Sequence, residues 1–344
     1  MITLKTLSDF IKARRQGILV IFAVITSAVI ISALLYFSDI NLIFNSIGAF
    51  DPKWYPVIFL LFVLLLIIVA LRLFLSLHLS GFNNYVLALD ASLLHIILLN
   101  ILPARLGDLC YPFLLKSNLK VITARSLANL VIIRIYDYVS VITLLMLSSC
   151  IYFLRTNNSL DFQIYLLAGM PAIVLFIFIL RTTTKLLQKH ITKGRYHIFK
   201  KDIHDFLIEL NSSFSELKFM DHVLLLITTS LRWLVASLLF FSIFKGLGIS
   251  AIDFNASILI TTGINLSVVI PIQTIGGFGL AETVLAYFLG LFGYPVSSAI
   301  AIAIATRILW LFVLFSIGGL WLMFRKYILK SLKYYDSVES TIIQ

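Results

Sequence analysis

Charged side chains are scarce in this sequence, where Asp, Glu, Lys and Arg together make up 12% of the 344 residues. Soluble globular domains carry roughly 25%. This shortage of charge excludes an ordinary soluble domain. In addition, 60% of the residues are hydrophobic. Runs such as 54–75 are long enough to cross the hydrocarbon core of a bilayer, which needs about 20 apolar residues. We therefore predict an all-α polytopic membrane protein.

Cysteine is also rare, since Cys110 and Cys150 are the only two and both lie in apolar surroundings. Two cysteines without a ligand spacing exclude a disulfide framework and a cysteine-rich metal site. The sequence also lacks a phosphate-binding loop, a dinucleotide fingerprint and a cluster of metal ligands. We therefore expect no cofactor, no metal and no catalytic residue.

Acidic residues are fewer than basic ones, with 16 Asp and Glu against 27 Lys and Arg. The basic residues gather mainly in three blocks, at 5–15, 181–201 and 325–333. Each block flanks an apolar run, as the positive-inside rule describes for cytoplasmic segments. This placement argues against a nucleic-acid-binding groove, so we expect no nucleic acid partner. It predicts a protein of the cytoplasmic (inner) membrane with both termini in the cytoplasm.

Two termini on one side of the membrane require an even number of full crossings. Hydropathy predicts six, at about 18–37, 54–79, 127–153, 160–180, 222–244 and 296–324. The whole of 1–344 is then a single integral membrane domain. It divides into an N-terminal anchor span (17–53), a first repeat (54–181), a basic cytoplasmic loop (182–221), a second repeat (222–324) and a cytoplasmic tail (325–344).

The basic loop contains an amphipathic segment at 203–218, where apolar residues recur at intervals of three and four. That period predicts a helix with one apolar face. The helix is expected to lie on the inner leaflet or against the bundle. An ordinary cytoplasmic connector is the alternative.

Two apolar stretches, 84–120 and 251–293, are interrupted by residues that break helices. The first contains Pro103-Ala104-Arg105-Leu106-Gly107-Asp108, and the second contains Pro271 and then Gly276-Gly277-Phe278-Gly279-Leu280-Ala281-Glu282. Irregular backbone at membrane depth is tolerated where protein or a water-filled cavity satisfies its polar groups. We predict that each stretch is a re-entrant, broken helical hairpin that returns to the side it came from. Full crossings by the outer arms, giving seven or eight helices, are the alternative.

The two interruptions belong to an internal repeat. Its order is arginine, asparagine, proline, glycine, carboxylate and arginine, given first by Arg72, Asn100, Pro103, Gly107, Asp108 and Arg134, and then by Arg232, Asn265, Pro271, Gly276, Glu282 and Arg307. The predicted span at 54–79 runs toward the cytoplasm and the span at 222–244 runs away from it. The two copies are therefore expected to form an inverted-topology repeat, with a binding site where the broken helices meet.

Charged residues inside the apolar segments are numerous, namely Arg72, Asp90, Arg105, Asp108, Arg134, Asp137, Arg232, Glu282 and Arg307. Since a charge at the bilayer centre costs about 2.5–3.5 kcal/mol, these side chains should face inward and pair. The repeat predicts that Asp108 pairs with Arg134 and Glu282 with Arg307. The guanidinium fork binds phosphate in a bidentate manner.

These charges predict an anion-binding site. Its substrate-binding residues are expected to be Arg105, Arg134, Arg232 and Arg307. The carboxylates that pair with them or carry a coupling proton are expected to be Asp108, Asp137 and Glu282. The re-entrant backbone breaks are predicted at Pro103, Gly107, Pro271, Gly276, Gly277 and Gly279. The alternatives are structural: Arg72, Arg134 and Arg307 can act as snorkelling anchors or as partners of carboxylates, and Gly276, Gly277 and Gly279 can allow close helix packing.

These motifs resemble the membrane domain of lysylphosphatidylglycerol synthases, which also occurs alone as flippase-like integral membrane proteins. The resemblance rests on 102–108, on Ile133-Arg134-Ile135-Tyr136-Asp137 and on 271–282, and it extends from about the second to the sixth predicted span. It implies a lipid-translocating unit that moves charged or glycosylated lipids between leaflets. Bifunctional members add a soluble aminoacyl-transfer domain. Because this sequence ends at residue 344, shortly after its last predicted span, we expect that activity not to apply.

Together these features predict a lipid translocase of the cytoplasmic membrane and not an enzyme. Its partner would be a membrane lipid with an anionic headgroup, either an anionic phospholipid or a polyprenyl-phosphate-linked glycolipid. One alternative is an integral membrane lipid-modifying transferase, in which the buried acids perform acid–base chemistry. Another is an accessory subunit of a membrane glycosyltransferase. The sequence leaves open whether the protein is a homo-oligomer.

Overall fold

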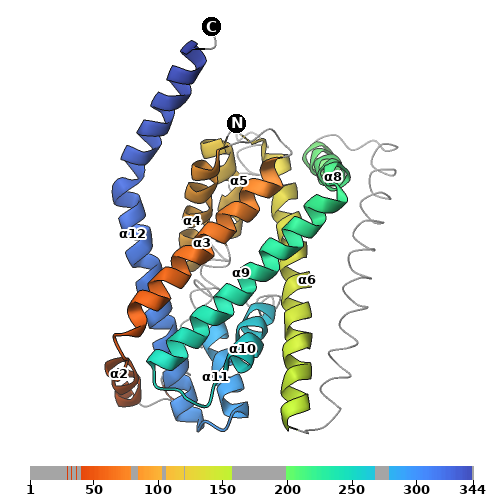
Figure 1. Ribbon diagram of the computed structural model, residues 1–344. Coiled ribbons are helices and arrows are strands. Elements are labelled where there is room, and N and C mark those ends of the chain that lie inside the picture. Colours follow the sequence, from red (N-terminus) through yellow and green to blue (C-terminus); the bar gives the residue numbers. More distant parts are fainter. Residues whose placement is uncertain are drawn as a thin grey trace, which may run out of the picture.

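The computed structural model describes residues 29, 32, 36, 40–78, 84–102, 106–119, 121–156, 199–267 and 279–342. These residues form helices and short connections, with no strand among them. The helices are α2 (Ile40–Gly48), α3 (Trp54–His78), α4 (Tyr85–Ile101), α5 (Leu106–Leu119), α6 (Thr123–Thr156), α8 (Phe199–Glu216), α9 (Phe219–Gly246), α10 (Phe254–Ser267), α11 (Leu280–Leu291) and α12 (Val296–Ile342). Figure 1 shows them as an elongated bundle, with α12 running its full height and beyond.

Four of these helices are long and apolar enough to cross a membrane: α3, α6, α9 and α12. They coincide with four of the six predicted spans. A helix satisfies its own backbone polar groups, which is why such apolar stretches fold this way in lipid. The predicted span at 160–180 lies outside the described residues, and so does the span at 18–37 apart from residues 29, 32 and 36.

The centre of the bundle is the packing of α3 along α9. The two helices run antiparallel, and the backbone N–H of Asp51, just before α3, donates to the carbonyl of Gly246 at the end of α9 (2.8 Å). Their facing side chains form the largest apolar core, to which α4 and α12 contribute. An antiparallel α3 and α9 is the relation that an inverted repeat requires.

Two pairs of shorter helices flank this centre. Helices α4 and α5 pack on each other and on α3 and α6, and α10 and α11 pack on each other and on α6, α9 and α12. In Figure 1, α4 and α5 occupy the upper half of the bundle, and α10 and α11 occupy the lower half. We call these pairs the first hairpin (α4 and α5) and the second hairpin (α10 and α11).

The first hairpin closes through a glycine. Asn84 caps the start of helix α4, where its side chain accepts from the backbone N–H of Leu87 (3.1 Å), and Leu102, which follows the helix, has extended backbone. That backbone suits the residue before a proline. A Cβ atom at Gly107 would lie 2.6 Å from the backbone nitrogen of Leu99. Gly107 therefore allows close packing of α5 on α4.

The predicted amphipathic helix is α8, and its apolar face packs on α6. Leu210 is buried against Ala128 and Ile132 of α6. At the end of α8, Glu216 pairs with Arg125 of α6 (2.6 Å). From sequence we expected this helix to lie on the inner leaflet or against the bundle. In the structure α8 packs against the bundle.

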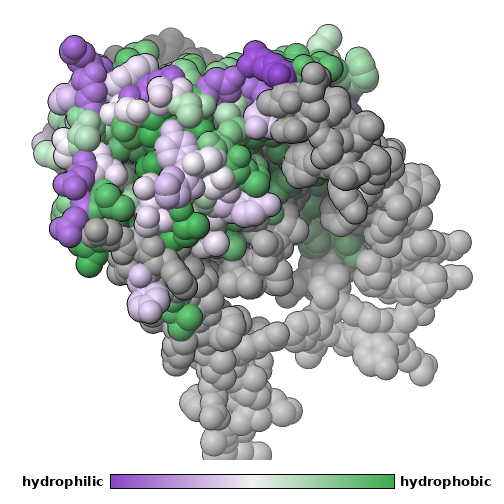
Figure 2. Space-filling view, turned by 90° about the horizontal axis from the view of Figure 1, so that it is seen from below, coloured by the Kyte–Doolittle hydropathy of each residue, from purple (hydrophilic) through white to green (hydrophobic). Residues whose placement is uncertain are grey.

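The surface of the described residues differs between the flanks and the ends. Large apolar side chains are exposed on the flanks of the long helices, for example Leu60 (69%), Ile227 (57%) and Phe312 (59%). Figure 2, seen from below, shows many hydrophilic residues on the lower end. The exposed ion pair between Arg155 and Asp253 (2.7 Å) joins α6 to the start of α10. Apolar flanks between polar ends are expected of a membrane-spanning bundle.

Candidate functional site

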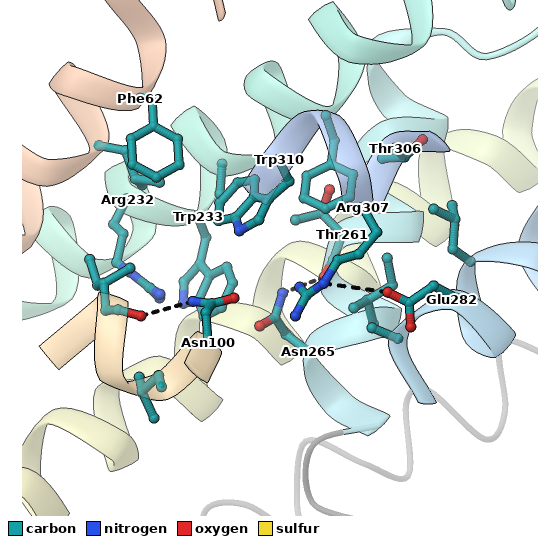
Figure 3. A pocket seen from close by; sticks show the side chains of 18 of the residues that line it. Phe62, Asn100, Arg232, Trp233, Thr261, Asn265, Glu282, Thr306, Arg307 and Trp310 are labelled. Carbon is teal, nitrogen blue, oxygen red and sulfur yellow. Dashed lines mark hydrogen bonds and ion pairs between the residues drawn. The ribbon is translucent and has the colours of Figure 1, made fainter. Parts of the chain in front are cut away.

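A cavity of about 210 Å³ lies within the bundle. It is lined by α3 and α4 from the first half of the chain and by α9, α10, α11 and α12 from the second. Much of the lining is apolar or aromatic. Figure 3 shows the polar side chains that converge on this space, namely Asn100, Arg232, Thr261, Asn265, Glu282, Thr306 and Arg307. Both predicted hairpin stretches therefore contribute to one cavity.

The acid of the second hairpin is held at the start of α11. Gly279 precedes this helix with φ 93°, a backbone conformation that favours glycine. Its N–H donates to Oε2 of Glu282 (2.6 Å), while Oε1 lies 3.4 Å from Nε of Arg307 on α12. Glu282 is buried. The predicted pair of Glu282 and Arg307 is thus present, and both members line the cavity.

The acid of the first hairpin occupies the equivalent place at the start of α5. Oδ1 of Asp108 lies 2.5 Å from Nη2 of Arg134 on α6 and 3.2 Å from Nε2 of His95 on α4. The His95 ring in turn packs on the ring of Tyr111. The predicted pair of Asp108 and Arg134 is therefore also present. Neither member lines the cavity.

Asp137 on α6 joins the two halves. Its carboxylate lies 2.5 Å from Arg72 of α3, 3.1 Å from Arg232 of α9 and 3.6 Å from Arg134. Since Arg72 is only 6% exposed, it is a structural partner of this carboxylate and not a snorkelling anchor. Sequence reasoning named Asp137 but did not foresee that three arginines surround it. We call Asp108, Asp137 and these arginines the ion cluster.

Arg232 connects the ion cluster to the cavity. Its Nη1 donates to Asp137, and its guanidinium lies 4.0 Å above the ring of Trp233. Arg232 and Arg307 are the predicted substrate-binding arginines that line the cavity, whereas Arg134 lies within the ion cluster. Counting these groups, four arginines (72, 134, 232 and 307) face three carboxylates (108, 137 and 282). The described site thus has a positive balance.

The repeated asparagines have matching contacts. Nδ2 of Asn100 donates to the carbonyl of Ile96 (2.9 Å), and Nδ2 of Asn265 donates to the carbonyl of Thr261 (2.7 Å). Both bonds span four residues, and both asparagines line the cavity. Neither was predicted as a site residue. Their shared place in the repeat was the signal that could have found them.

Four buried polar atoms beside the cavity have no hydrogen-bond partner among the described residues. They are Nε of Arg232, Nε1 of Trp233, Oγ1 of Thr306 and Oε1 of Glu282, of which the last has only its 3.4 Å ion pair with Arg307. Trp233 and Thr306 are 5% and 1% exposed and line the cavity. Buried polar groups are normally satisfied, so these atoms are places where water or a ligand can bind. The sequence carried no signal for Thr306.

Five predicted residues lie outside the described part of the chain, namely Pro103, Arg105, Pro271, Gly276 and Gly277.

A further buried acid lies apart from the cavity lining. Asp90 on α4 accepts from Nε (2.6 Å) and Nη2 (2.9 Å) of Arg325 and from Nε1 of Trp321 (2.9 Å), both on α12. Sequence reasoning had assigned Arg325 to the basic cytoplasmic tail, whereas α12 continues through it as a helix.

Comparison with known proteins agrees with this architecture. Residues 20–318 match the family model for the lysylphosphatidylglycerol synthase TM region. A curated relative, a UPF0104 membrane protein of Methanocaldococcus jannaschii, is 24% identical over 222 residues, which cover 64% of this chain and 91% of the relative. No solved structure matches the chain. Because the family model covers most of the sequence, the chain belongs to the family defined by the lysylphosphatidylglycerol synthase transmembrane region.

Proposed function

We propose that this protein is a lipid translocase, not an enzyme, which moves an anionic phospholipid or a polyprenyl-phosphate-linked glycolipid between the leaflets of the cytoplasmic membrane. One observation carries the proposal. A cavity with arginines from α9 and α12 lies inside a largely apolar bundle, and both hairpins contribute to its lining. A buried polar site in a membrane bundle is expensive, so its presence indicates a polar ligand that crosses the bilayer.

The size of the cavity supports a headgroup as that ligand. Its volume of about 210 Å³ equals about seven waters at roughly 30 Å³ each. Sites that enclose a whole drug-sized ligand measure roughly 300–1,000 Å³. The cavity is therefore suited to the polar headgroup, while the acyl or prenyl chains stay in the surrounding lipid.

The short helices support alternating access. The helices of the two hairpins have 17, 14, 14 and 12 residues. At 1.5 Å per residue the longest measures about 26 Å, which is less than the roughly 30 Å of the hydrocarbon core. The hairpins are accordingly re-entrant arms that come from opposite faces and meet at the cavity. Movement of the two repeats against each other then exposes the headgroup to one side at a time.

Each charged group has a role in this mechanism. Arg232 and Arg307 contact the phosphate, since both line the cavity and each guanidinium presents several N–H donors. Glu282 positions Arg307, and Asp137 positions Arg232. Arg134 and Asp108 keep the ion cluster neutral enough to remain buried.

Reconstitution in liposomes tests this function. The protein is inserted into vesicles that contain acyl-labelled fluorescent phosphatidylglycerol, and dithionite quenching measures how fast the label crosses. Wild-type protein should accelerate crossing, and Glu282→Gln and Arg307→Ala, which both change residues that line the cavity, should each reduce it strongly. Asp253→Asn, which alters an exposed ion pair far from the cavity lining, is the matched control. Full activity in both site variants would refute these assignments.

The same vesicles distinguish translocation from lipid chemistry. Mass spectrometry of the lipids after incubation with a cytosolic extract should show unchanged lipid masses. A product whose mass depends on intact Glu282 would instead identify a lipid-modifying transferase. Site variants without any effect, together with a co-purifying glycosyltransferase, would identify an accessory subunit.

A further inference from the structure

The acid that lines the cavity also indicates what drives the lipid across the membrane. We propose that Glu282 takes up one proton with each anionic headgroup, so that the protein is a proton-coupled lipid symporter. This inference rests on the proposed function and adds the coupling ion of the same site. Three observations carry it: the contacts of Glu282, the charged groups around it, and the contrast with the two acids of the ion cluster.

The first observation is that one oxygen of the Glu282 carboxylate is weakly held. Glu282 is only 4% exposed. Its Oε2 accepts from the N–H of Gly279 (2.6 Å), whereas Oε1 is buried without a hydrogen bond among the described residues and faces Nε of Arg307 at 3.4 Å. A charge-assisted hydrogen bond measures about 2.7–2.9 Å. Oε1 is therefore a position where a proton can be added without breaking a hydrogen bond.

The second observation is that the charge of Glu282 depends on Arg307. Helix α11 packs on α10 and α12. Arg307 faces Glu282 from α12, α10 contains no titratable residue within its bounds, and the other titratable residue of α11, Tyr287, is 65% exposed. The remaining titratable residue of the described lining is Arg232 of α9, which is held by Asp137. Figure 3 shows Glu282 and Arg307 side by side at the cavity.

A lipid phosphate and Glu282 compete for the same guanidinium. The phosphate is proposed to bind Arg307, and a phosphodiester brings one negative charge into the cavity. A buried carboxylate that loses its counter-charge is strongly unfavourable and neutralises instead. The proton comes from water on the side to which the cavity is open, and it bonds to Oε1 of Glu282. The negative charge lost at Glu282 equals the charge that the phosphate brings, so loading leaves the net charge of the cavity unchanged.

This balance couples the lipid to the proton. The empty cavity, with Glu282 ionised, and the loaded cavity, with Glu282 protonated, carry the same charge. Phosphate without the proton, or the proton without phosphate, leaves an unbalanced charge in the bundle, which is costly at membrane depth. The balanced states are therefore the ones that change access. On the far side the phosphate leaves, Arg307 pairs again with Glu282, and the proton passes to the water there.

The third observation is that the acids of the ion cluster do not depend on the contents of the cavity. Asp108 contacts Arg134 (2.5 Å) and His95 (3.2 Å), and none of these three residues lines the cavity. Asp137 keeps Arg72 and Arg134 even when Arg232 turns toward a phosphate. Their counter-charges stay in place during loading. Glu282 is thus the acid whose partner the substrate removes.

The first test counts the protons that are taken up on binding. The full chain in detergent is titrated with dihexanoyl phosphatidylglycerol, a soluble lipid whose phosphodiester does not titrate near neutral pH. Calorimetry in two buffers of different ionisation enthalpy gives the number of protons bound per lipid. Wild-type protein should take up about one proton, so its Kd should rise by up to about tenfold for each unit of increasing pH.

Two variants assign this proton. Glu282→Gln can still accept from the N–H of Gly279 but cannot take up a proton. It should bind about one proton fewer per lipid than wild type, and its Kd should lose the corresponding pH dependence. Asp253→Asn, which removes an exposed carboxylate apart from the lining, is the matched control and should keep the wild-type uptake. His95 is present in all three proteins, so its titration cancels in the comparison.

The second test applies a pH gradient to vesicles with acyl-labelled phosphatidylglycerol. The interior is made one pH unit more acidic than the exterior, and dithionite measures the label in the outer leaflet. Symport of one proton with each lipid should enrich the outer leaflet up to about tenfold. The enrichment should vanish when the gradient is collapsed with a protonophore. The slow crossing that remains in Glu282→Gln should give no enrichment.

The outcomes separate the two proposals. If wild-type protein moves the lipid but shows neither proton uptake nor enrichment, the coupling inference is wrong and the translocase remains. Proton uptake in Glu282→Gln equal to that of wild type would also overturn the inference, because another group would then carry the proton. If no lipid binds and none crosses faster than in empty vesicles, the proposed function fails and the inference fails with it.

Discussion

The two hairpins carry equivalent acids in different surroundings. Asp108 lies in the first turn of α5, and Glu282 lies in the first turn of α11. Asp108 contacts Arg134 and His95 inside the ion cluster, away from the cavity lining. Glu282 lines the cavity and is held by a backbone N–H. The acid of the first hairpin therefore belongs to the ion cluster, whereas the acid of the second hairpin belongs to the lining of the cavity.

The two hairpins also close in different ways. At Gly107 an added Cβ would meet the backbone of α4, which cannot move aside. At Gly263 of α10 it would meet the ring of Phe288 on α11, and a ring can rotate. The first hairpin therefore tolerates a larger side chain at its glycine less well than the second does. If this comparison holds, changes in the first hairpin and the ion cluster should mainly reduce stability, and changes around Glu282 should mainly reduce function.

The largest effect is expected for Asp137→Asn. The substitution leaves Arg72, Arg134 and Arg232 without their shared counter-charge, and breaking a buried ion pair costs about 3–5 kcal/mol. Thermal unfolding in nanodiscs, followed by tryptophan fluorescence, should show a large fall in Tm. A Tm close to that of wild type would mean that the ion cluster does not hold the two halves together.

Gly107→Leu should have the next largest effect on stability. Overpacking against a backbone costs about 1–3 kcal/mol and can cost more. Gly263→Leu, at the second hairpin, should cost less, because the Phe288 ring can turn away. The same unfolding measurement compares the two variants. Equal losses of Tm in the two variants would contradict the expected difference in packing at Gly107 and Gly263.

Glu282→Gln sharpens the functional side of the comparison. Glutamine can still accept from the N–H of Gly279, so the loss of stability should be smaller, roughly 1–3 kcal/mol. The rate of lipid crossing should fall far more than it does in a first-hairpin variant of equal Tm, such as Tyr111→Phe, which removes the hydroxyl that donates to Asn129. The measurement is the loss of crossing rate relative to the loss of Tm in each variant. Equal ratios in the two variants would contradict the mainly functional role of Glu282.

The asparagines test the one feature that the halves share equally. Asn100→Leu and Asn265→Leu each remove an amide that faces the cavity, so each should weaken lipid binding by about 1 kcal/mol. Native mass spectrometry of retained lipid measures this loss. A loss at Asn265 alone would show that only the second half contacts the ligand.

The smallest effect is expected for Arg155→Ala. Its ion pair with Asp253 is exposed, with 63% and 55% of the side-chain surfaces accessible. Exposed pairs contribute about 0–1 kcal/mol. Both Tm and crossing rate should stay close to wild type at 150 mM salt, a physiological ionic strength. A large loss of Tm or of crossing rate would contradict the expectation that this exposed ion pair contributes little.

Much of the site was predictable because charges in lipid must pair. The repeat alone identified Asp108 with Arg134 and Glu282 with Arg307, and the structure contains both pairs. Four predicted spans coincide with long apolar helices, since an uninterrupted apolar run has one stable solution in a bilayer. These predictions needed only local composition and the symmetry between the two halves.

The rest required three-dimensional packing. Arg72 and Arg232 share Asp137 because α3, α6 and α9 come together there, which no sequence spacing encodes. Arg134, by contrast, lies three residues before Asp137 on α6. Thr306 was missed because threonines in apolar helices usually bond to their own backbone, as Thr262 does. The role of each half could not be read from the repeat, because equivalent residues occupy different surroundings.

The contact of Asp90 with Arg325 has a mechanical consequence. Helix α12 holds the first hairpin through Arg325 and the second hairpin through Arg307, which pairs with Glu282. These arginines are 18 residues apart on one continuous helix, or about 27 Å at 1.5 Å per residue. The helix thus acts as a rod fastened to both arms. A tilt of one hairpin should therefore be transmitted to the other through this helix.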